Sequence, residues 1–197
     1  MEKVISNAAQ NNPAAFFNLI SHPFKFKMYL LKNLPAAYFS GLKVKEATPS
    51  YCTVSIAFKW FTRNPFRSTY FACLSMAAEL STGILAMAAV YKKQPAVSLL
   101  VIGIEGKFYK KATGISWFTC NEGSKFSEAV QQALTSGQPQ EVKASSVGKN
   151  DKGELVAEFW ITWSFKVKAA SSSDLSMLVK EATFENNSLS QDDKTYS

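Results

Sequence analysis

Apolar and polar positions along the chain alternate with different periods, and each period predicts one kind of element. Between residues 51 and 60 the even positions are apolar, which is the period of a half-buried strand. The same alternation from 155 to 168 predicts a long strand with one wet face. Apolar residues at helical spacings over 13–34, broken at His22-Pro23, predict two short helices with a turn between them.

The second half of the chain adds further strands and one amphipathic helix. Residues 97–112 and 115–120 are rich in β-branched and aromatic side chains and predict two strands joined around Gly114. Residues 124–137 have apolar positions on one helical face and end at a glycine. A polar hairpin loop is expected at 148–153. Together these elements predict an α+β fold with an antiparallel sheet.

The segment 68–90 is apolar on most sides and predicts one long helix, with Ser68 or Thr69 as its cap. A membrane span of this length is conceivable. Its centre would carry Glu79, however, and a charged residue there costs about 2.5–3.5 kcal/mol. The strands on either side also belong to a sheet in water. We therefore expect a core helix wrapped by the sheet and no membrane span.

Glu79 is the one carboxylate of this helix, and small or polar side chains surround it. At about 100° per residue its own face carries Ala72, Ser75, Thr82 and Gly83. Such a face suits close approach of a ligand or of a second helix. The alternative is a structural glutamate held by a lysine, an arginine or a backbone donor.

Tyr70 and Glu79 are nine residues apart, about 900°, which places their side chains on opposite sides of the helix. One helix does not easily aim both at one substrate. A symmetric dimer does, because the start of one helix can face the middle of its partner. We therefore expect a homodimer, and pairing of dimers into tetramers stays open.

Composition narrows the chemistry. The chain has 197 residues, 47% of them apolar, which is enough for one core. Its three cysteines stand apart in apolar runs and its one histidine lies near the N-terminus, so we expect buried thiols, no cysteine–histidine nucleophile and no metal site. No resident cofactor is expected.

Charge and terminal segments suggest the organisation of the chain. The net charge is +7, but residues 169–197 hold five acids against two lysines, which leaves +10 on residues 1–168. A basic body can attract nucleic acid, anionic lipid or a phosphorylated ligand. The N-terminus lacks the pattern of a secretory signal, so a cytoplasmic protein is expected. We predict an N-terminal helical segment (1–34), a main domain (35–168) and a polar, flexible tail (169–197).

The order of elements resembles the hotdog fold, in which an antiparallel sheet wraps a long central helix. Phenylacetate-type hotdog thioesterases carry Asn, five residues, His-Gly-Gly, six residues, and then Asp or Glu. This chain has Asn64, Tyr70-Phe71-Ala72 and Glu79 at those spacings, without the His-Gly-Gly itself. Residues 101–120 also resemble a strand pair of that family, and the likeness covers roughly 35–168.

The resemblance implies hydrolysis of an acyl-CoA thioester, with coenzyme A as part of the substrate. Glu79 would be the general base or nucleophile, and the Phe71 amide an oxyanion donor beside Ala72. Tyr70 and Asn64 would orient water or the thioester, although capping of the turn is an equal role for Asn64. Basic candidates for the phosphates, which could equally be solvated charges, are Lys107, Lys110, Lys111, Arg63 and Arg67.

Three functions therefore compete. The first is acyl-CoA hydrolysis, and the second is a non-catalytic hotdog module that binds an acyl thioester or lipid without turnover. A nucleic-acid surface is the third, and no Arg-rich helix, RNP-like aromatic pair or Gly-rich phosphate loop supports it. A hotdog dehydratase would pair its acid with a histidine, which this helix does not have nearby. We expect an acyl thioester as partner rather than nucleic acid.

Overall fold

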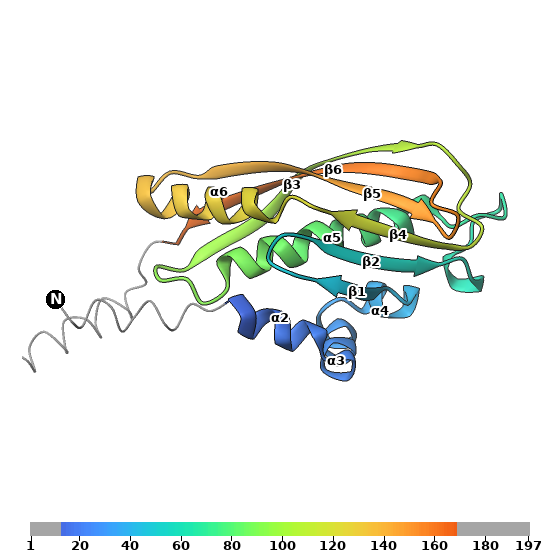
Figure 1. Ribbon diagram of the computed structural model, residues 1–197, viewed down its shortest axis with the longest axis horizontal. Coiled ribbons are helices and arrows are strands. Elements are labelled where there is room, and N and C mark those ends of the chain that lie inside the picture. The colour runs from blue at the N-terminus through green and yellow to red at the C-terminus, as the bar shows by residue number, and fades with distance from the viewer. Residues whose placement is uncertain (1–12, 169–197) are drawn as a thin grey trace, which may run out of the picture. The chain divides into compact units, whose positions relative to one another are not determined.

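The computed structural model describes residues 13–168, and one antiparallel sheet of six strands dominates them (Figure 1). The strand order in the sheet is β1-β2-β4-β5-β6-β3, so β1 and β3 are its two edges. Every pairing is antiparallel. The strands are β1 (Lys43–Ala47), β2 (Cys52–Ala57), β3 (Val97–Phe108), β4 (Ile115–Cys120), β5 (Gln140–Asn150) and β6 (Leu155–Val167).

Five helices and one 3-10 turn accompany the sheet. Each of the first three helices begins with a proline, whose fixed φ and missing N–H suit the first helical position. The helix that ends at Ser40 is closed by Gly41 in the left-handed region, at φ 72°. The elements are α2 (Pro13–Ser21), α3 (Pro23–Asn33), α4 (Pro35–Ser40), the 3-10 turn η2 (Trp60–Thr62), α5 (Phe71–Val90) and α6 (Gly123–Ser136).

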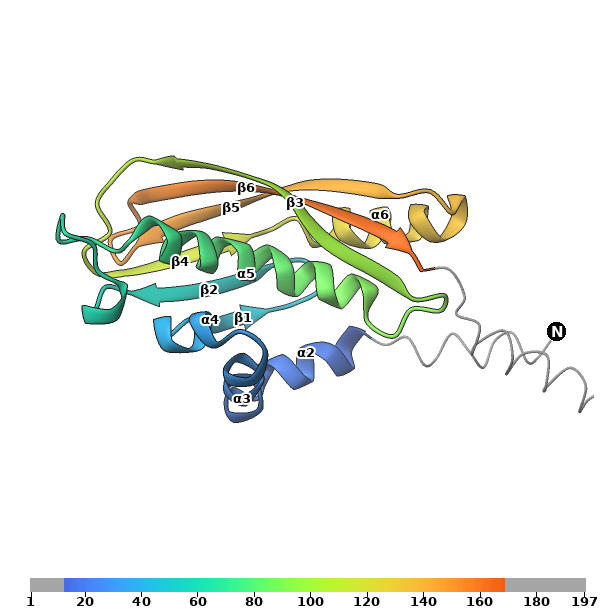
Figure 2. The same ribbon diagram turned by 180° about the vertical axis from the view of Figure 1, so that it is seen from behind.

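The long helix α5 lies along one face of the curved sheet, and both views show it running beside β2, β4 and β3 (Figure 1, Figure 2). It is long and apolar enough to cross a membrane, with a mean hydropathy of 1.6, but 72% of that stretch is buried inside the protein. Ser81 joins it to the sheet, since its hydroxyl lies 2.7 Å from the hydroxyl of Ser146 on β5. This helix is therefore the core of the fold, as expected of a hotdog architecture.

Several boundaries differ from the sequence predictions. The core helix begins at Phe71 rather than at residue 68, because Ser68 and Thr69 are used in the preceding turn and Tyr70 is the N-cap. The two helices predicted over 13–34 are confirmed as α2 and α3, and a further short helix, α4, follows them. The strand β2 ends at Ala57, so the Trp60 side chain, predicted on its apolar face, lies in η2 and is 75% exposed.

The helix α6 ends at Gly137, whose φ is 68°, as predicted. Strand β3 ends at Phe108 rather than at 112. The hairpin between β5 and β6 turns at 151–154 rather than over the predicted 148–153, because Gly148 and Lys149 still pair within the sheet. Strand β1 was not predicted. The predicted tail at 169–197 lies outside the described residues.

Candidate active site

Glu79 lies on the one side of α5 that the sheet leaves partly open. Ala72, Ser75, Met76, Glu79 and Met87 are all half-buried, whereas nearly all other positions from Cys73 to Ala89 are buried. Ala72, Ser75, Met76 and Glu79 form one stripe on neighbouring turns of one side of the helix, and Met87 follows two turns after Glu79. The predicted face around Glu79 therefore exists, and its first half is accessible.

The Glu79 carboxylate is buried without a charged partner. Burial raises its pKa above the ordinary value, and no other influence on that pKa is found. Among residues 13–168, no lysine, arginine or backbone donor pairs with it. The alternative of a structural glutamate held by such a group therefore finds no support in the described part of the chain.

Trp163 of β6 and Gly83 define the other wall of this carboxylate. A methyl group placed on Gly83 would lie 3.2 Å from Glu79 Oε1 and 3.3 Å from the Trp163 ring. The absence of a side chain at position 83 thus lets the carboxylate and the indole approach each other over the helix. Trp163 is 4% exposed, so it closes this end of the stripe.

Thr82 connects that tryptophan to the helix backbone. The Trp163 Nε1–H donates to Thr82 Oγ1 at 3.0 Å, and the Thr82 hydroxyl donates to the Glu79 carbonyl at 2.9 Å. Thr82 and Gly83, predicted to touch substrate, are both buried, and both lie against Trp163.

The start of α5 is built by a turn that Asn64 organises. Its Oδ1 accepts from the Phe66 amide at 3.0 Å and from the Ser68 amide at 3.2 Å, and its Nδ2 donates to Ser68 Oγ. These are the contacts of the capping role left open for Asn64. A part for Asn64 in orienting water or the thioester stays a prediction.

The first amides of α5 are free to bind an anion or a carbonyl oxygen. The Cys73 and Leu74 amides donate to the Tyr70 carbonyl, but within the described chain the Phe71 and Ala72 amides have no acceptor. Orphan amides at a helix start carry partial positive charge. The oxyanion donor predicted at Phe71 is therefore available in the backbone.

Within one chain, however, the helix start is remote from Glu79. Eight residues separate Phe71 from Glu79, which is about 12 Å along the axis. The Tyr70 ring instead lies edge-on to Phe71, at 4.8 Å between ring centres. One chain alone does not bring the predicted catalytic groups together.

Strand β3 supplies an uncovered apolar wall that the sequence did not reveal. The pairing of β3 with β6 shifts register between Val101 and Gly103, so Ile102 has no partner on β6. Beyond this shift, Ile104 lies opposite Ile161 and Phe108 opposite Ala157. Directly opposed residues share a face of a sheet. Since Ile161 and Ala157 are fully buried, Ile104 and Phe108 lie on the same face of the sheet as these core residues.

That wall is nonetheless open. Ile104 is 53% exposed and Phe108 52%, and the Phe108 ring packs edge-on against Phe71 at 6.4 Å and Phe159 at 5.5 Å. The start of α5 and the edge of the sheet therefore share one apolar surface. Apolar side chains on a core-facing surface that no described residue covers indicate a ligand or a partner.

Basic residues border the same end of the fold. Thr69 donates through its amide (2.8 Å) and hydroxyl (3.1 Å) to the Ala112 carbonyl, which joins the turn before α5 to the loop after β3. Arg67 in the first segment and Lys111 in the second are exposed. Lys110 is already paired with Glu154 at 2.5 Å.

The cysteines and candidate metal ligands fall outside this site. Cys52, Cys73 and Cys120 are free, buried thiols, as predicted, and burial raises the pKa of Cys52 to about 12 and of Cys120 to about 11. No cluster of three or more His, Cys, Asp or Glu side chains able to hold a metal ion occurs within residues 13–168.

Comparison with known protein families identifies the family of this chain. Residues 26–165 match the family described as a domain of unknown function, DUF4442. The chain belongs to the DUF4442 family. No curated protein matches its sequence.

Solved structures extend the likeness to the whole fold. A Pseudomonas aeruginosa protein of unknown function, described as a probable thioesterase, is 20% identical with a TM-score of 0.63, over 74% of this chain and 97% of that one. A Chlorobaculum tepidum protein of unknown function is 12% identical with a TM-score of 0.63, over 74% and 97%. A Haemophilus influenzae thioesterase is 12% identical with a TM-score of 0.52, over 72% and 90%. The DUF4442 chain thus has the hotdog fold predicted from its sequence.

Proposed function

We propose that this protein hydrolyses an acyl thioester, with acyl-CoA as the substrate class and Glu79 as general base or nucleophile. The observation that carries the proposal is the Glu79 carboxylate itself, which is half-buried on the open side of α5, has a raised pKa and has no partner in the described chain. A base whose pKa approaches working pH is effective in proton transfer. The names of the structural relatives agree with this reaction class.

As a base, Glu79 takes a proton from a water molecule whose oxygen attacks the thioester carbonyl. The C–S bond then breaks, the thiolate leaves and is protonated, and the acid product remains. The free Phe71 and Ala72 amides are suited to the developing oxyanion because a helix start stabilises negative charge. The apolar surface formed by Phe71, Ile104 and Phe108 suits an acyl chain.

The two halves of this mechanism require two chains. In a two-fold dimer, the helix start of one protomer faces Glu79 of its partner, and each protomer contributes to two composite sites. The open β3 edge, with its uncovered Ile104 and Phe108, is the surface we assign to this contact. Arg67 and Lys111 would then meet the phosphates of coenzyme A, with Lys110 released from Glu154 to join them.

One observation favours a second candidate, a module that binds an acyl thioester without turnover. The His-Gly-Gly pattern that the sequence resembles has glycine at the position of Phe71, whereas here a half-exposed aromatic ring stands at the helix start, against Phe108. Its bulk narrows the approach to the backbone amides.

Release of free thiol from short, medium, long and aromatic acyl-CoAs distinguishes the two. We expect turnover by the native protein and a loss of about 100-fold or more in Glu79→Gln. The control Glu128→Gln, which makes the same change at an exposed position of α6, should turn over substrate as fast as the native protein. Acyl-CoA binding without turnover in the native protein would establish the binding module instead. Equal turnover by Glu79→Gln would remove Glu79 from the mechanism.

A further inference from the structure

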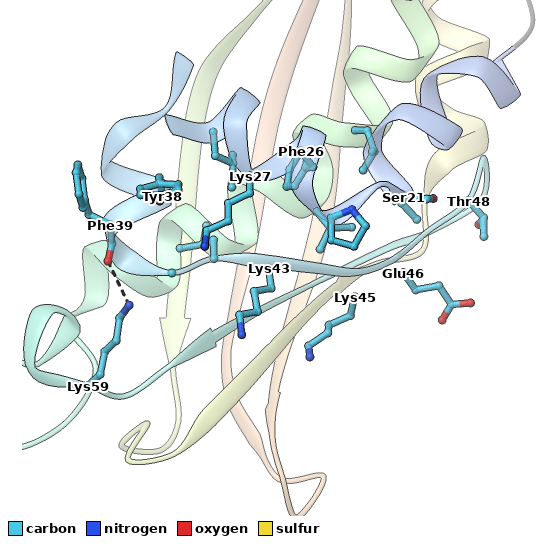
Figure 3. Close-up of a pocket in the computed structure, with 17 residues that line it drawn as sticks. Ser21, Phe26, Lys27, Tyr38, Phe39, Lys43, Lys45, Glu46, Thr48 and Lys59 are labelled. Atoms are coloured by element: carbon cyan, nitrogen blue, oxygen red, sulfur yellow. Dashed lines mark hydrogen bonds between the residues drawn. The ribbon is translucent and has the colours of Figure 1, made fainter. Parts of the chain in front are cut away.

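A second hollow lies away from Glu79, between the N-terminal helices and the edge strand β1 (Figure 3). Its volume is about 920 Å³, within the range of about 300–1,000 Å³ typical of small-molecule sites. The residues that line it come from α2, α3, α4, β1 and the segments next to them, and none comes from α5. The groove is therefore separate from the carboxylate stripe.

The floor of this groove is apolar. Ile20, Phe26, Leu30 and Leu42 line it with side chains that are otherwise buried in the core. They come from α2, α3 and the residue just before β1, so the apolar surface extends across several elements. Such a lining favours a hydrocarbon chain, which gains by leaving water and needs no directional contacts.

The mouth of the groove is basic. Lys27 of α3, Lys43 and Lys45 of β1, and Lys59 beside η2 all line it, against one acid, Glu46. Figure 3 shows Lys43 and Lys45 on the same strand, with Lys27 coming from a helix and Lys59 from the segment before η2. The lining thus carries three more positive than negative side chains, although like charges placed together oppose one another in an empty site.

No acidic side chain of the described chain neutralises these lysines. Within residues 13–168 none of the four forms an ion pair. Lys27 lies over the Tyr38 ring at 5.7 Å, and Lys59 donates to the Phe39 carbonyl at 3.2 Å. Glu46, the single acid of the lining, raises the pKa of the nearby Tyr51 hydroxyl through hydrogen bonding and through its negative charge.

Strand β1 is a poor template for an added peptide strand. It has only five residues, and its pairing with β2 is irregular between Val44 and Glu46. Short, bulged edges are unfavourable for pairing with another chain. An apolar floor with a cationic mouth is instead complementary to an amphipathic anion.

We propose that this groove binds a long-chain fatty acid, with the alkyl chain along Phe26, Leu30 and Leu42 and the carboxylate among Lys27, Lys43 and Lys45. Lysine presents a single flexible charge, which suits a carboxylate, whereas phosphate groups are commonly held by the planar fork of arginine. The lining contains no arginine. Binding here involves no residue of the Glu79 site.

Calorimetric titration of the full chain with monomeric dodecanoate and tetradecanoate tests the proposal. We expect saturable binding that tightens by roughly threefold for each added methylene. The double substitution Lys43→Glu and Lys45→Glu should weaken binding about tenfold or more, whereas Lys149→Glu with Lys152→Glu, the same charge change on the β5–β6 hairpin, should not. Ser21→Trp, at an exposed lining position, should also block the groove without disturbing the core.

Other results would overturn the assignment. Binding that survives both groove variants but is lost in Ile104→Lys would place the fatty acid at the Glu79 surface. Equal binding of dodecylamine, or tighter binding of dodecyl phosphate, would exclude carboxylate recognition. Association with anionic vesicles but not with monomeric fatty acid would identify a membrane-binding surface instead. Hydrolysis of acyl-CoA is measured separately, so its failure would leave these outcomes unchanged.

Discussion

At the scale of single residues, Glu79 is a charged group in a poorly solvated place. Its raised pKa means that the folded protein holds this proton more tightly than the unfolded chain does. The resulting stability is complete below the ordinary glutamate pKa and is lost as pH rises through the folded pKa. Ionised Glu79 therefore weakens the fold under the conditions in which it could act as a base.

Removal of the Glu79 charge should therefore stabilise the folded protein at neutral pH. Glu79→Gln should match the native protein in free energy of unfolding near pH 4 and exceed it at pH 7.5, by about 0.5–2 kcal/mol. Urea unfolding at a series of pH values measures this difference. A variant that is less stable at pH 7.5 would mean that the carboxylate has a stabilising partner.

Trp163 should help to raise the pKa of Glu79 by keeping water away from its carboxylate. Trp163→Phe removes the donor to Thr82, at a cost of about 1 kcal/mol, and admits water to the carboxylate. The pKa of Glu79 should move toward its ordinary value, so the acid limb of the rate–pH profile should shift to lower pH. Trp117→Phe on β4 is the matched control. Loss of stability with an unmoved profile would limit Trp163 to packing.

At the scale of elements, a glycine of β5 leaves room for an aromatic ring of β4. A methyl group on Gly148 would lie 2.4 Å from the Phe118 ring, whereas one on Gly114 would meet nothing within 4 Å. Gly148→Ala should therefore lower the free energy of unfolding by about 1–3 kcal/mol, and Gly114→Ala should change it by less than about 0.5 kcal/mol. Equal effects would show that the β4–β5 spacing is not fixed by this contact.

The elements that the sequence predicted correctly are those in which apolar and polar residues alternate regularly. Residues 155–168 alternate cleanly because β6 is buried on one face, and α6 has a marked apolar side. Strand β1 escaped notice because only Val44 and Ala47 of its five residues are even half-buried. Such a pattern resembles a polar loop.

Only those residues of the candidate site that lie on the helix α5 could be predicted from the sequence. Glu79 and its small neighbours follow from helical geometry, which sequence spacing determines. Trp163, Ile104 and Phe108 reach the site through strand pairing and through the irregularity at Ile102, and neither leaves a local signal in the sequence. Similarly, the turn contacts of Asn64 could not be separated from a catalytic role before the structure.

At the scale of the whole molecule, β3 presents a long open edge. It has 12 residues, and Leu100, Ile102 and Ile104 are all about half-exposed or more. Long apolar edges are seldom left uncovered in a protein that stays monomeric. The sheet is thus suited to continue into a second copy.

We expect a homodimer in solution, and Ile104→Lys should convert it to a monomer. Its molecular mass by light scattering should halve, and thioester turnover should fall with it because each composite site needs both chains. Leu19→Lys, at a comparably exposed apolar position of α2, should change neither property. A native protein that is monomeric at assay concentrations and still active would refute the two-chain mechanism.

The buried cysteines have a practical consequence for all of these experiments. Cys52, Cys73 and Cys120 are the only thiols of the chain, each is buried, and each has a raised pKa, so few thiolates are present at neutral pH. Ellman's reagent will therefore report coenzyme A released by the enzyme with little background from the protein. The native chain is also ready for labelling, because one cysteine introduced on β3 would be the reactive thiol for a dye or a cross-link across the two-fold axis.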